Sequence, residues 1–381
     1  MNAAQRGRAG GPVLVAFGTR PEVIKLAPVV QALAARQVPR FVLSTGQHRQ
    51  MLDQMLGVFG LEPDEDLALM QPDQSLAGLS SAMIAAADPL LARVAPSLVV
   101  VQGDTTTVAM IALAAFYRQI PVAHVEAGLR TGVRYDPFPE EMNRSLLGRL
   151  AEWHFAPTPR AAENLFAEGI SRERIFVVGN TVVDALEEVR RRVAPEPWGA
   201  FGLPDPGDRA LILVTAHRRE NLGGGLERLA EGLRRIALAH AGRVQVVYPV
   251  HLNPNVRSAV LPPLADLPGV TLLEPLGYPA FVKALSAARL VITDSGGVQE
   301  EATALGVPLL VTRETSERPE AIEAGVAELV GTDPERIAAA AGRLLTDAGH
   351  HASRARAAAV FGDGRAGARI VEHLLEALAG P

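Results

Sequence analysis

Residues 293–308, TDSGGVQEEATALGVP, form a polar, glycine-containing turn that leads into a helical pattern and then toward a second apolar run. The apolar run 290–292 precedes the turn, and the helical pattern begins near Gln299. A strand, a turn, a helix and another strand in this order indicate a βαβ unit of a parallel sheet. Because ligands of such sheets bind at the carboxyl ends of the strands, the turn is also a candidate binding site.

Short β-branched runs alternate with helical patterns along the rest of the chain. Runs this apolar, separated by helices, are typical of parallel sheets that are covered on both faces. Aromatic residues make up 4% of the sequence, which disfavours an all-β sandwich. The predicted strands are 13–17, 40–44, 98–102, 121–125, 175–178, 210–215, 244–248, 270–273, 289–293 and 308–312. Helical periodicity is seen, for example, at 22–36, 105–118, 224–239 and 298–305.

Length and proline content predict two domains. A chain of 381 residues forms about two domains at ~150 residues each. Segment 194–209 carries four prolines and three glycines, so it is expected to be a loop near the domain boundary and neither a helix nor a central strand. FGDG at 361–364 precedes a final amphipathic helix at 365–379. The predicted fold class is therefore α/β, with two doubly wound parallel sheets.

Composition excludes several classes of protein. The formal net charge of −5 gives no reason to expect broad nucleic-acid binding. The absence of cysteine excludes disulfides and thiolate metal sites, and it fits a reducing cytoplasm. The longest apolar stretch, 108–117, is about half a membrane span, and residues 1–11 are a polar tail, so a soluble protein is expected. The histidines lack metal-ligand spacing, so no metal is predicted.

Two cations follow the first predicted strand. GTRPEVIKLAP places Arg20 and Lys25 near a helix N-terminus, where free backbone N–H groups favour anions. These residues are either an anion site or solvated surface charges. A Walker loop is excluded because its glycine–lysine spacing is missing.

Three carboxylates form a candidate acid–base group. Asp104 follows a predicted strand in QGDTTT, Glu126 follows the next strand in HVEAGLRT, and Glu140 opens a helix in DPFPEEMNR. Each has a structural alternative: a helix cap formed by Asp104 or by one of the threonines after it, an ion pair with Arg130 for Glu126, and an acidic first turn for Glu140. Three such groups near one site can shift one another's pKa toward acid–base chemistry.

Candidate ligand-binding groups also follow strands in the second half of the chain. His217 comes after the run 210–215, beside Arg218 and Arg219, and His251 comes after the run 244–248. Taken alone, His217 is as easily a surface residue or a helix cap as a site residue.

Residues 293–308 add phosphate-binding and ribose-binding groups to this candidate site. Gly296 and Gly297 let backbone N–H groups approach a ligand, and the helix N-terminus favours phosphate. Ser295 can donate to a phosphate oxygen, and the Glu301 carboxylate can accept from the vicinal hydroxyls of a ribose. With Arg318 as a further phosphate contact, the stretch is interpreted as a nucleotide site. The alternative is a glycine turn capped by a serine or an aspartate.

The motifs together resemble one family. GTRPEVIKLAP, TGQH, QGDTTT, HVEAGLRT, PFPEEMNR, TAHRREN, YPVHLNPNV, TDSGGVQEEA and ERPEA occur in this order from about residue 13 to the FGDG region. In this order and spacing, the chain resembles the non-hydrolysing UDP-N-acetylglucosamine 2-epimerases over nearly its whole length.

The resemblance implies a GT-B fold, in which two Rossmann-like domains flank a cleft. It implies an N-terminal domain at 12–190, a UDP-binding domain at 191–364, and a helix at 365–381 that crosses back to the first domain. It also implies a cytoplasmic homodimer that interconverts UDP-GlcNAc and UDP-ManNAc for polysaccharide biosynthesis, with UDP kept bound and no cofactor.

The family's proposed chemistry assigns roles to the matched residues. Elimination of UDP would give a 2-acetamidoglucal, and UDP would then add back while a proton arrives on the other face of C2. The resemblance assigns the acid–base steps to Asp104, Glu126 and Glu140, and stabilisation of the departing UDP to His217. The substrate-binding residues that it implies are Arg20, Lys25, Arg144, Phe281, Ser295, Gly296, Gly297, Glu301 and Arg318.

Two regions differ from, or only partly match, the family pattern. Leu276 stands in the uracil region where relatives can carry a polar residue. Gln47, His48, Gln50 and His251 match part of an allosteric UDP-GlcNAc site, but the basic residue of that pattern is missing near 73–74.

Other functions remain compatible with the sequence. The alternatives are a 2-epimerase of a modified UDP-sugar, such as a UDP-2,3-diacetamido uronic acid, a GT-B glycosyltransferase, a hydrolysing epimerase and a non-catalytic UDP-sugar binding protein.

Overall fold

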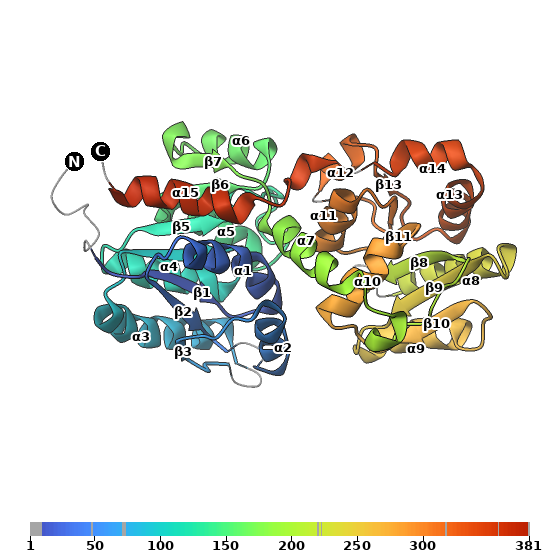
Figure 1. The fold of residues 1–381 in the computed structure, drawn as a ribbon, viewed down its shortest axis with the longest axis horizontal. Helices are drawn as coiled ribbons and strands as arrows, with labels where there is room; N and C mark the ends of the chain where they lie inside the picture. Colours follow the sequence, from blue (N-terminus) through green and yellow to red (C-terminus); the bar gives the residue numbers. More distant parts are fainter. Residues whose placement is uncertain are drawn as a thin grey trace. The chain divides into compact units, whose positions relative to one another are not determined.

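The computed structural model describes residues 10–46, 49–70, 74–218, 221, 223–316, 318–356 and 358–379. The chain divides into two compact units, Met1–Ala185 with Gly362–Pro381, and Leu186–Phe361. The division falls within α7 (Thr181–Val193). Each unit is built on its own parallel sheet with flanking helices (Figure 1). None of the helices in the described part of the chain is both long enough and apolar enough to cross a membrane.

The first unit contains a seven-stranded parallel sheet in the order β3-β2-β1-β4-β5-β6-β7. Its strands are β1 (Val13–Phe17), β2 (Arg40–Ser44), β3 (Glu65–Asp66), β4 (Leu98–Gln102), β5 (Val122–Val125), β6 (Trp153–Ala156) and β7 (Ile175–Val177). Its helices besides α7 are α1 (Arg20–Ala35), α2 (Arg49–Phe59), α3 (Leu76–Val94), α4 (Thr106–Tyr117), α5 (Glu140–Leu150), α6 (Pro159–Ala167) and α15 (Ala366–Ala379).

The C-terminal helix α15 packs against α1 in the first unit (Figure 1). The Asp184 carboxylate accepts the N–H groups of Ala366 (3.1 Å) and Gly367 (2.8 Å), which would otherwise lack partners at the start of the helix. A Cβ atom on Gly367 would lie 2.8 Å from the carbonyl oxygen of Pro28. Only glycine allows the two helix backbones to approach this closely.

The second unit contains a six-stranded parallel sheet in the order β10-β9-β8-β11-β12-β13. Its strands are β8 (Ala210–Thr215), β9 (Val244–Pro249), β10 (Val270–Leu273), β11 (Leu290–Thr293), β12 (Leu309–Val311) and β13 (Ala327–Leu329). Its helices are α8 (Gly225–Ala239), α9 (Pro254–Leu264), α10 (Tyr278–Ala287), α11 (Gly296–Leu305), α12 (Pro319–Glu323), α13 (Pro334–Thr346) and α14 (Ala348–Arg354).

In each sheet the strand order reverses at one point. The reversal lies between β1 and β4 in the first unit and between β8 and β11 in the second. The central strands β1, β4 and β11 are fully buried, which explains their uninterrupted apolar sequences. The loops that follow the strands at such a reversal point form the usual ligand site of a doubly wound sheet.

The ten predicted strands are confirmed to within one residue at each end. Three short strands, β3, β6 and β13, were not predicted, because runs such as Trp153–Ala156 have no strong β pattern. Segment 194–209 is not wholly irregular, since Trp198–Phe201 form a single 3₁₀ turn. A single 3₁₀ turn needs only a few residues without proline, and the prolines of this segment lie outside it.

Candidate active site

A buried glutamate, Glu22, ties together the turns that follow β1 and β4. Its carboxylate accepts hydrogen bonds from the N–H of Gly18 (2.6 Å), the N–H of Thr19 (3.0 Å) and the hydroxyl of Thr105 (2.7 Å). Burial raises the pKa of Glu22 and the nearby Asp104 charge adds to this, while the hydrogen bonds oppose the shift. Sequence analysis missed Glu22, although its spacing from Thr19 is that of a capping box.

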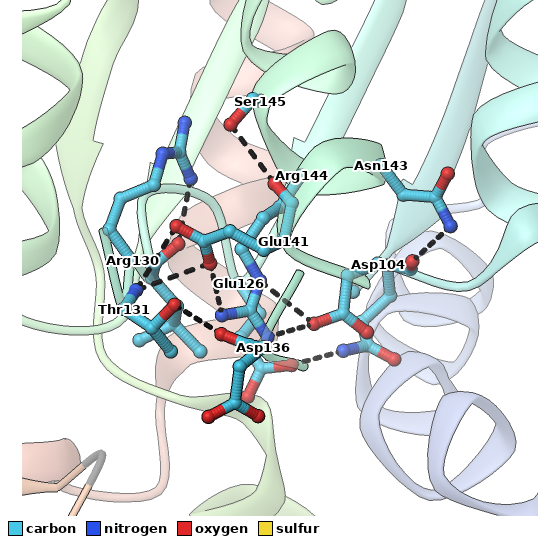
Figure 2. Close-up of polar contacts among 12 residues, drawn as sticks. Asp104, Glu126, Arg130, Thr131, Asp136, Glu141, Asn143, Arg144 and Ser145 are labelled. Carbon is cyan, nitrogen blue, oxygen red and sulfur yellow. Dashed lines mark hydrogen bonds and ion pairs between the residues drawn. The ribbon is translucent and has the colours of Figure 1, made fainter. Parts of the chain in front are cut away.

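Asp104 lies just after β4 and is held by a buried arginine of α5 (Figure 2). Oδ2 of Asp104 lies 2.5 Å from Nη2 and 3.1 Å from Nε of Arg144, and Nδ2 of Asn143 donates to the Asp104 carbonyl at 2.9 Å. Thr105, and not Asp104, caps α4. About a quarter of the Asp104 side chain, 26%, is exposed. Asp104 is therefore both oriented by Arg144 and accessible to a ligand.

Two adjacent glutamates at the start of α5 differ in their contacts. Glu141 is 4% exposed and accepts the N–H groups of Thr131 and Gly132 at 3.0–3.2 Å, and it also lies 3.1 Å from Nη1 of Arg144. Glu140 is partly exposed, and among the described residues its carboxylate has no hydrogen-bond or ion-pair partner. Glu141 therefore fixes a loop, whereas Glu140 is available to a ligand.

Glu126 follows β5 and is buried among polar groups. Its backbone is left-handed, with φ of 61°, an unusual conformation for a residue other than glycine. Its carboxylate contacts the Lys25 ammonium and the Gln102 side-chain amide, and it accepts from Nδ2 of Asn180 at 2.9 Å. Gln102 and Asn180 were not predicted as site residues. Gln102 is the last residue of β4 and begins the QGDTTT motif, and Asn180 comes shortly after β7.

The two cations predicted as a possible anion site lie on α1. Arg20 is the first residue of that helix and is partly exposed. Lys25 is largely buried and contacts Glu126. The structural alternative for Glu126, an ion pair with Arg130, is wrong, because Arg130 instead forms a bidentate pair with Glu168 at 2.6 and 2.8 Å. A bidentate fork to a carboxylate is the favoured geometry for an arginine.

A buried histidine supports the backbone that carries Asp104. Nε2 of His124 lies 2.7 Å from the carbonyl oxygen of Gly103, so this nitrogen bears the proton and donates it. His124 pairs across the sheet with His154, which is equally buried. Burial lowers the pKa of His124 to about 4 and that of His154 to about 3. Both rings are therefore neutral at physiological pH.

In the second unit, Asp294 organises the loop that follows β8. Its Oδ2 atom accepts from the N–H of His217 (2.9 Å), the N–H of Arg218 (2.8 Å) and Nδ2 of Asn221 (3.0 Å). Asp294 itself directly follows β11, the strand next to β8, and it is completely buried. The side chain therefore joins the two strand-end loops at the reversal point of this sheet.

The side chain of His217 is 43% exposed and stacks on His251, with ring centroids 5.0 Å apart and an interplanar angle of 9°. Its Nδ1 atom lies 3.9 Å from Oδ1 of Asp294. Burial lowers the pKa of His217, and the charges of His251 and Arg218 also lower it, while Asp294 opposes the shift.

The N-terminus of α11 has the features of an anion site. Ser295 is the N-cap residue, but its hydroxyl makes no capping hydrogen bond. A Cβ atom on Gly297 would meet nothing within 4 Å, and one on Gly296 would lie 3.8–3.9 Å from the guanidinium groups of Arg318 and Arg218. Two arginines therefore converge on a helix N-terminus with open space at its first turn. Arg218 was noted in the sequence only as a neighbour of His217.

Buried contacts hold Arg318 beside this helix. Its Nε atom lies 2.5 Å from Oε1 of Glu300, which is 1% exposed. Its N–H donates to the Ser316 hydroxyl at 3.0 Å, and Ser316 donates to Gln299 at 2.7 Å. The loop before α12 is thus fixed to α11.

The residues assigned to ribose and uracil lie on α10, α11 and the loop before α10. Glu301 is 5% exposed and accepts from the Tyr278 hydroxyl at 2.8 Å. Phe281 lies on α10 and is partly buried, as is Leu276 in the preceding loop. Tyr278 was not predicted, although it begins the same YPAF motif.

Part of the candidate allosteric site falls outside the described residues. This applies to Gln47 and His48, to the side chain of Gln50, and also to Arg219 beside His217. His251 is described, and its Nδ1 atom accepts from the N–H of Asn253 at 3.1 Å. Within the described part of the chain, no group of three or more His, Asp or Glu side chains is placed to hold a metal ion.

The protein has two doubly wound parallel sheets. The loops at the strand ends carry carboxylates in one unit and an anion site in the other. These features define a GT-B protein. Solved structures of this fold match the chain closely. The crystal structure of UDP-GlcNAc 2-epimerase from Neisseria meningitidis bound to UDP-GlcNAc has a TM-score of 0.89 and 41% identity, covering 96% of this chain and 100% of that one. A structure of UDP-GlcNAc 2-epimerase from Methanocaldococcus jannaschii in complex with UDP-GlcNAc and UDP has a TM-score of 0.81 and 33% identity, covering 96% and 99%. A glycosyltransferase of kitacinnamycin shares the fold alone, at 14% identity and a TM-score of 0.62.

Sequence comparisons identify the family. The family model for UDP-N-acetylglucosamine 2-epimerase matches residues 31–375. The UDP-N-acetylglucosamine 2-epimerase of Salmonella typhimurium is 50% identical over 370 residues, which covers 95% of this chain and 98% of that protein. The enzyme of the same name from Bacillus subtilis is 48% identical over 364 residues, which covers 95% and 94%. The chain belongs to the UDP-N-acetylglucosamine 2-epimerase family.

Proposed function

We propose that this protein interconverts UDP-GlcNAc and UDP-ManNAc by reversible epimerisation at C2 of the sugar. The observation that carries the proposal is the match, along nearly the whole chain, to relatives named UDP-N-acetylglucosamine 2-epimerase, one of which was solved with UDP-GlcNAc bound. The carboxylates and the anion site described above supply the chemistry that such a reaction needs.

The reaction proceeds by elimination and re-addition. The C2 proton of the sugar has no neighbouring carbonyl, so its direct removal would be very slow. Breaking the C1–O bond to UDP develops positive charge at C1, which makes the C2 proton removable and gives a 2-acetamidoglucal with UDP kept bound. The bond to UDP then re-forms at C1 while a proton is delivered to the opposite face of C2. Each cycle therefore needs one base, one acid and groups that stabilise the departing diphosphate.

The first unit supplies the acid–base groups. Asp104 is accessible and held in place by Arg144, and Glu140 is partly exposed without a partner among the described residues. Glu126 lies in a hydrogen-bonded setting with Lys25, Gln102 and Asn180. The three carboxylates therefore differ in exposure and in hydrogen-bond partners, as expected of groups that take different parts in a two-step proton transfer.

The second unit supplies the UDP site. The diphosphate lies at the N-terminus of α11, where Ser295 and the backbone N–H groups of Gly296 and Gly297 face it. Arg318 and Arg218 add positive charge at this point. His217 stabilises the departing UDP, and Glu301 binds the ribose together with Tyr278. Phe281 contacts uracil, and Arg20 and Lys25 are proposed as further substrate contacts.

We further propose that the protein is a cytoplasmic homodimer. Several large apolar side chains are exposed on α4 and α5, which pack against each other in the first unit. They are Phe116, Tyr117, Met142 and Leu146. Exposed apolar side chains on neighbouring helices can form a surface that another chain covers. Light scattering coupled to size exclusion would give twice the chain mass of 40.3 kDa if the proposal holds.

Proton NMR of the purified protein with UDP-GlcNAc in D₂O, without added cofactor or metal, tests the reaction. We expect UDP-ManNAc to appear together with loss of the C2 proton signal, because the base exchanges its proton with solvent. Free ManNAc with UDP would instead establish a hydrolysing enzyme. An unchanged spectrum would contradict the proposal, and the same assay with a UDP-2,3-diacetamido uronic acid would then test the modified substrate.

A pair of matched variants tests the acid–base assignment. Glu140→Gln removes a carboxylate at the proposed site, whereas Glu163→Gln changes an exposed glutamate of α6 that pairs only with the exposed Arg172 among the described residues. We expect the first to lower kcat by about 100-fold or more and the second to leave it unchanged. Equal activity of both variants would remove Glu140 from the mechanism.

A further inference from the structure

Holding the loop after β8 accounts for only one of the two carboxylate oxygens of Asp294. One of its carboxylate oxygens, Oδ2, accepts all three hydrogen bonds from the loop after β8. The other, Oδ1, is buried and has no hydrogen-bond partner among the described residues. An asparagine could hold the same loop with its single oxygen and would leave no buried anionic oxygen unpaired. Because an unpaired buried polar atom is costly, the second oxygen calls for a functional explanation.

The group placed to meet this oxygen is the ring of His217. Its Nδ1 atom lies 3.9 Å from Oδ1 of Asp294, about 1 Å beyond a hydrogen bond. The backbone N–H of His217 is already fixed to Oδ2 of the same carboxylate. The ring itself is 43% exposed and stacks on His251, so a small rotation about its side-chain torsions brings Nδ1 within reach of Oδ1.

We propose that Asp294 is a positioning residue for His217, with Oδ1 accepting the Nδ1–H of the imidazolium while Nε2–H faces the diphosphate of UDP. The inference rests on the proposed function, in which His217 stabilises the departing UDP. Asp294 thereby does two things at once, since one oxygen fixes the loop and the other orients and stabilises the charged ring that the loop carries.

The charges around the ring explain why such a partner is needed. His251 and Arg218 face His217 and disfavour a positive ring, and burial acts in the same direction. Tyr248 lies behind the loop, where its hydroxyl donates to the carbonyl of Ala216, so it does not compete for Oδ1. Among the described groups, Asp294 alone favours the imidazolium. A neutral ring with its proton on Nδ1 would present a lone pair, and not a donor, to the diphosphate.

The variant Asp294→Asn tests this role because it keeps one oxygen for the three loop donors and turns an amide toward the ring. We expect kcat to fall about 100-fold while KM for UDP-GlcNAc changes less than about threefold, and the alkaline limb of the kcat–pH profile to move to lower pH. The matched control is Asp333→Asn, an exposed aspartate that accepts a backbone N–H at the start of α13. It should leave all three quantities unchanged.

A double variant separates action through His217 from any other role of Asp294. His217→Gln should lower kcat by a similar factor, and Asp294→Asn should cost nothing more in the His217→Gln background. If the two losses multiply, or if Asp294→Asn keeps full kcat, Asp294 does not act through His217 and the inference fails.

A measurement on the unaltered protein avoids dependence on the folding of any variant and on turnover. ¹⁵N NMR of the imidazole groups with saturating UDP should show both nitrogens of His217 protonated, with the Nδ1 proton shifted downfield by its carboxylate partner. Neutral His217 in the UDP complex would overturn the inference. If UDP-GlcNAc is not turned over but this signature is present, the proposed function fails and the Asp294–His217 assignment stands.

Discussion

The two buried histidines of β5 and β6 predict a specific loss of stability in mild acid. Burial lowers the pKa of His124 to about 4 and that of His154 to about 3, against 6.5 for an unperturbed imidazole. Below pH 6.5 the unfolded chain therefore binds more protons than the folded one, so the free energy of unfolding decreases as the pH falls. The loss continues until the pH reaches the folded-state values.

At pH 5 the size of this loss depends only on the pKa of the two histidines in the unfolded chain. Both folded-state pKa values lie below 5, so each ring stays neutral in the native protein. A difference of ~1.5 pH units from the unfolded pKa, at about 1.4 kcal/mol per unit, gives about 2 kcal/mol per histidine. Together they predict a loss of about 4 kcal/mol between pH 7.5 and pH 5. Glu22 and Asp184, whose pKa values burial raises, contribute with the opposite sign.

The variant His154→Gln isolates one of the two contributions. The carboxylates are common to both proteins, so the difference between their pH profiles belongs to His154. We expect the variant to lose about 2 kcal/mol less than the unaltered protein over this range, whatever its stability at pH 7.5. Amide hydrogen exchange of β5 and β6 is the suitable measurement, since the two units of the chain can unfold separately. Parallel profiles for the two proteins would refute the assignment of a buried, neutral His154.

Two further predictions concern the loops at the strand ends. Arg144→Met leaves Asp104 and Glu141 without the guanidinium between them, so it should lower the free energy of unfolding of the first unit by about 3–5 kcal/mol. Arg144→Lys should lower it less, because the positive charge is kept. An unchanged melting temperature of Arg144→Met would contradict the contacts described. Gly297→Ala adds a Cβ atom into open space on a helix, so it should leave stability unchanged or higher by up to about 1 kcal/mol while weakening UDP binding in calorimetry. In Gly367→Ala the Cβ atom would lie 2.8 Å from the carbonyl oxygen of Pro28, so this variant should lose stability and keep its affinity for UDP. Equal UDP affinity of the unaltered protein, Gly297→Ala and Gly367→Ala would exclude α11 as the diphosphate site.

The positions of the strands and of the strand-end residues could be predicted from sequence because both depend on local pattern. Apolar β-branched runs mark β1, β4 and β11, and parallel strands place the residues that follow them at one edge of a sheet. Asp104 and Glu126 follow adjacent strands for this reason. The weakly patterned β6 was missed because Trp153–Ala156 is only four residues long and contains no β-branched residue.

The partners of these residues could not be predicted, because pairing depends on strand order and not on spacing. Arg130 lies four positions from Glu126, yet it pairs with Glu168, which directly follows α6. Glu126 is instead contacted by Asn180, which is 54 residues away and follows β7. Such contacts require that β5, β6 and β7 lie side by side, and the apolar pattern of the strands does not specify their order.

One arrangement recurs in three of the loops near the proposed site residues. A buried carboxylate accepts the N–H groups of two consecutive loop residues: Glu22 does so for Gly18 and Thr19, Glu141 for Thr131 and Gly132, and Asp294 for His217 and Arg218. These carboxylates are 2%, 4% and 0% exposed. Each loop is thus held before any ligand arrives, and it adjoins a proposed reactive or binding residue, which is Arg20, Glu126 and His217 in turn.

This arrangement separates the carboxylates that hold the backbone from those that take part in chemistry. Both oxygens of Glu22 and both oxygens of Glu141 already accept hydrogen bonds from the loops and their neighbours, so these two carboxylates are unsuited to act as bases. Asp104 and Glu140 accept no backbone N–H group among the described residues and are partly exposed, which leaves them accessible to a ligand. Asp294 belongs to both groups, because Oδ2 holds a loop while Oδ1 remains unpaired. Fixed loops that carry accessible reactive groups give the preorganisation on which electrostatic stabilisation of a departing diphosphate depends.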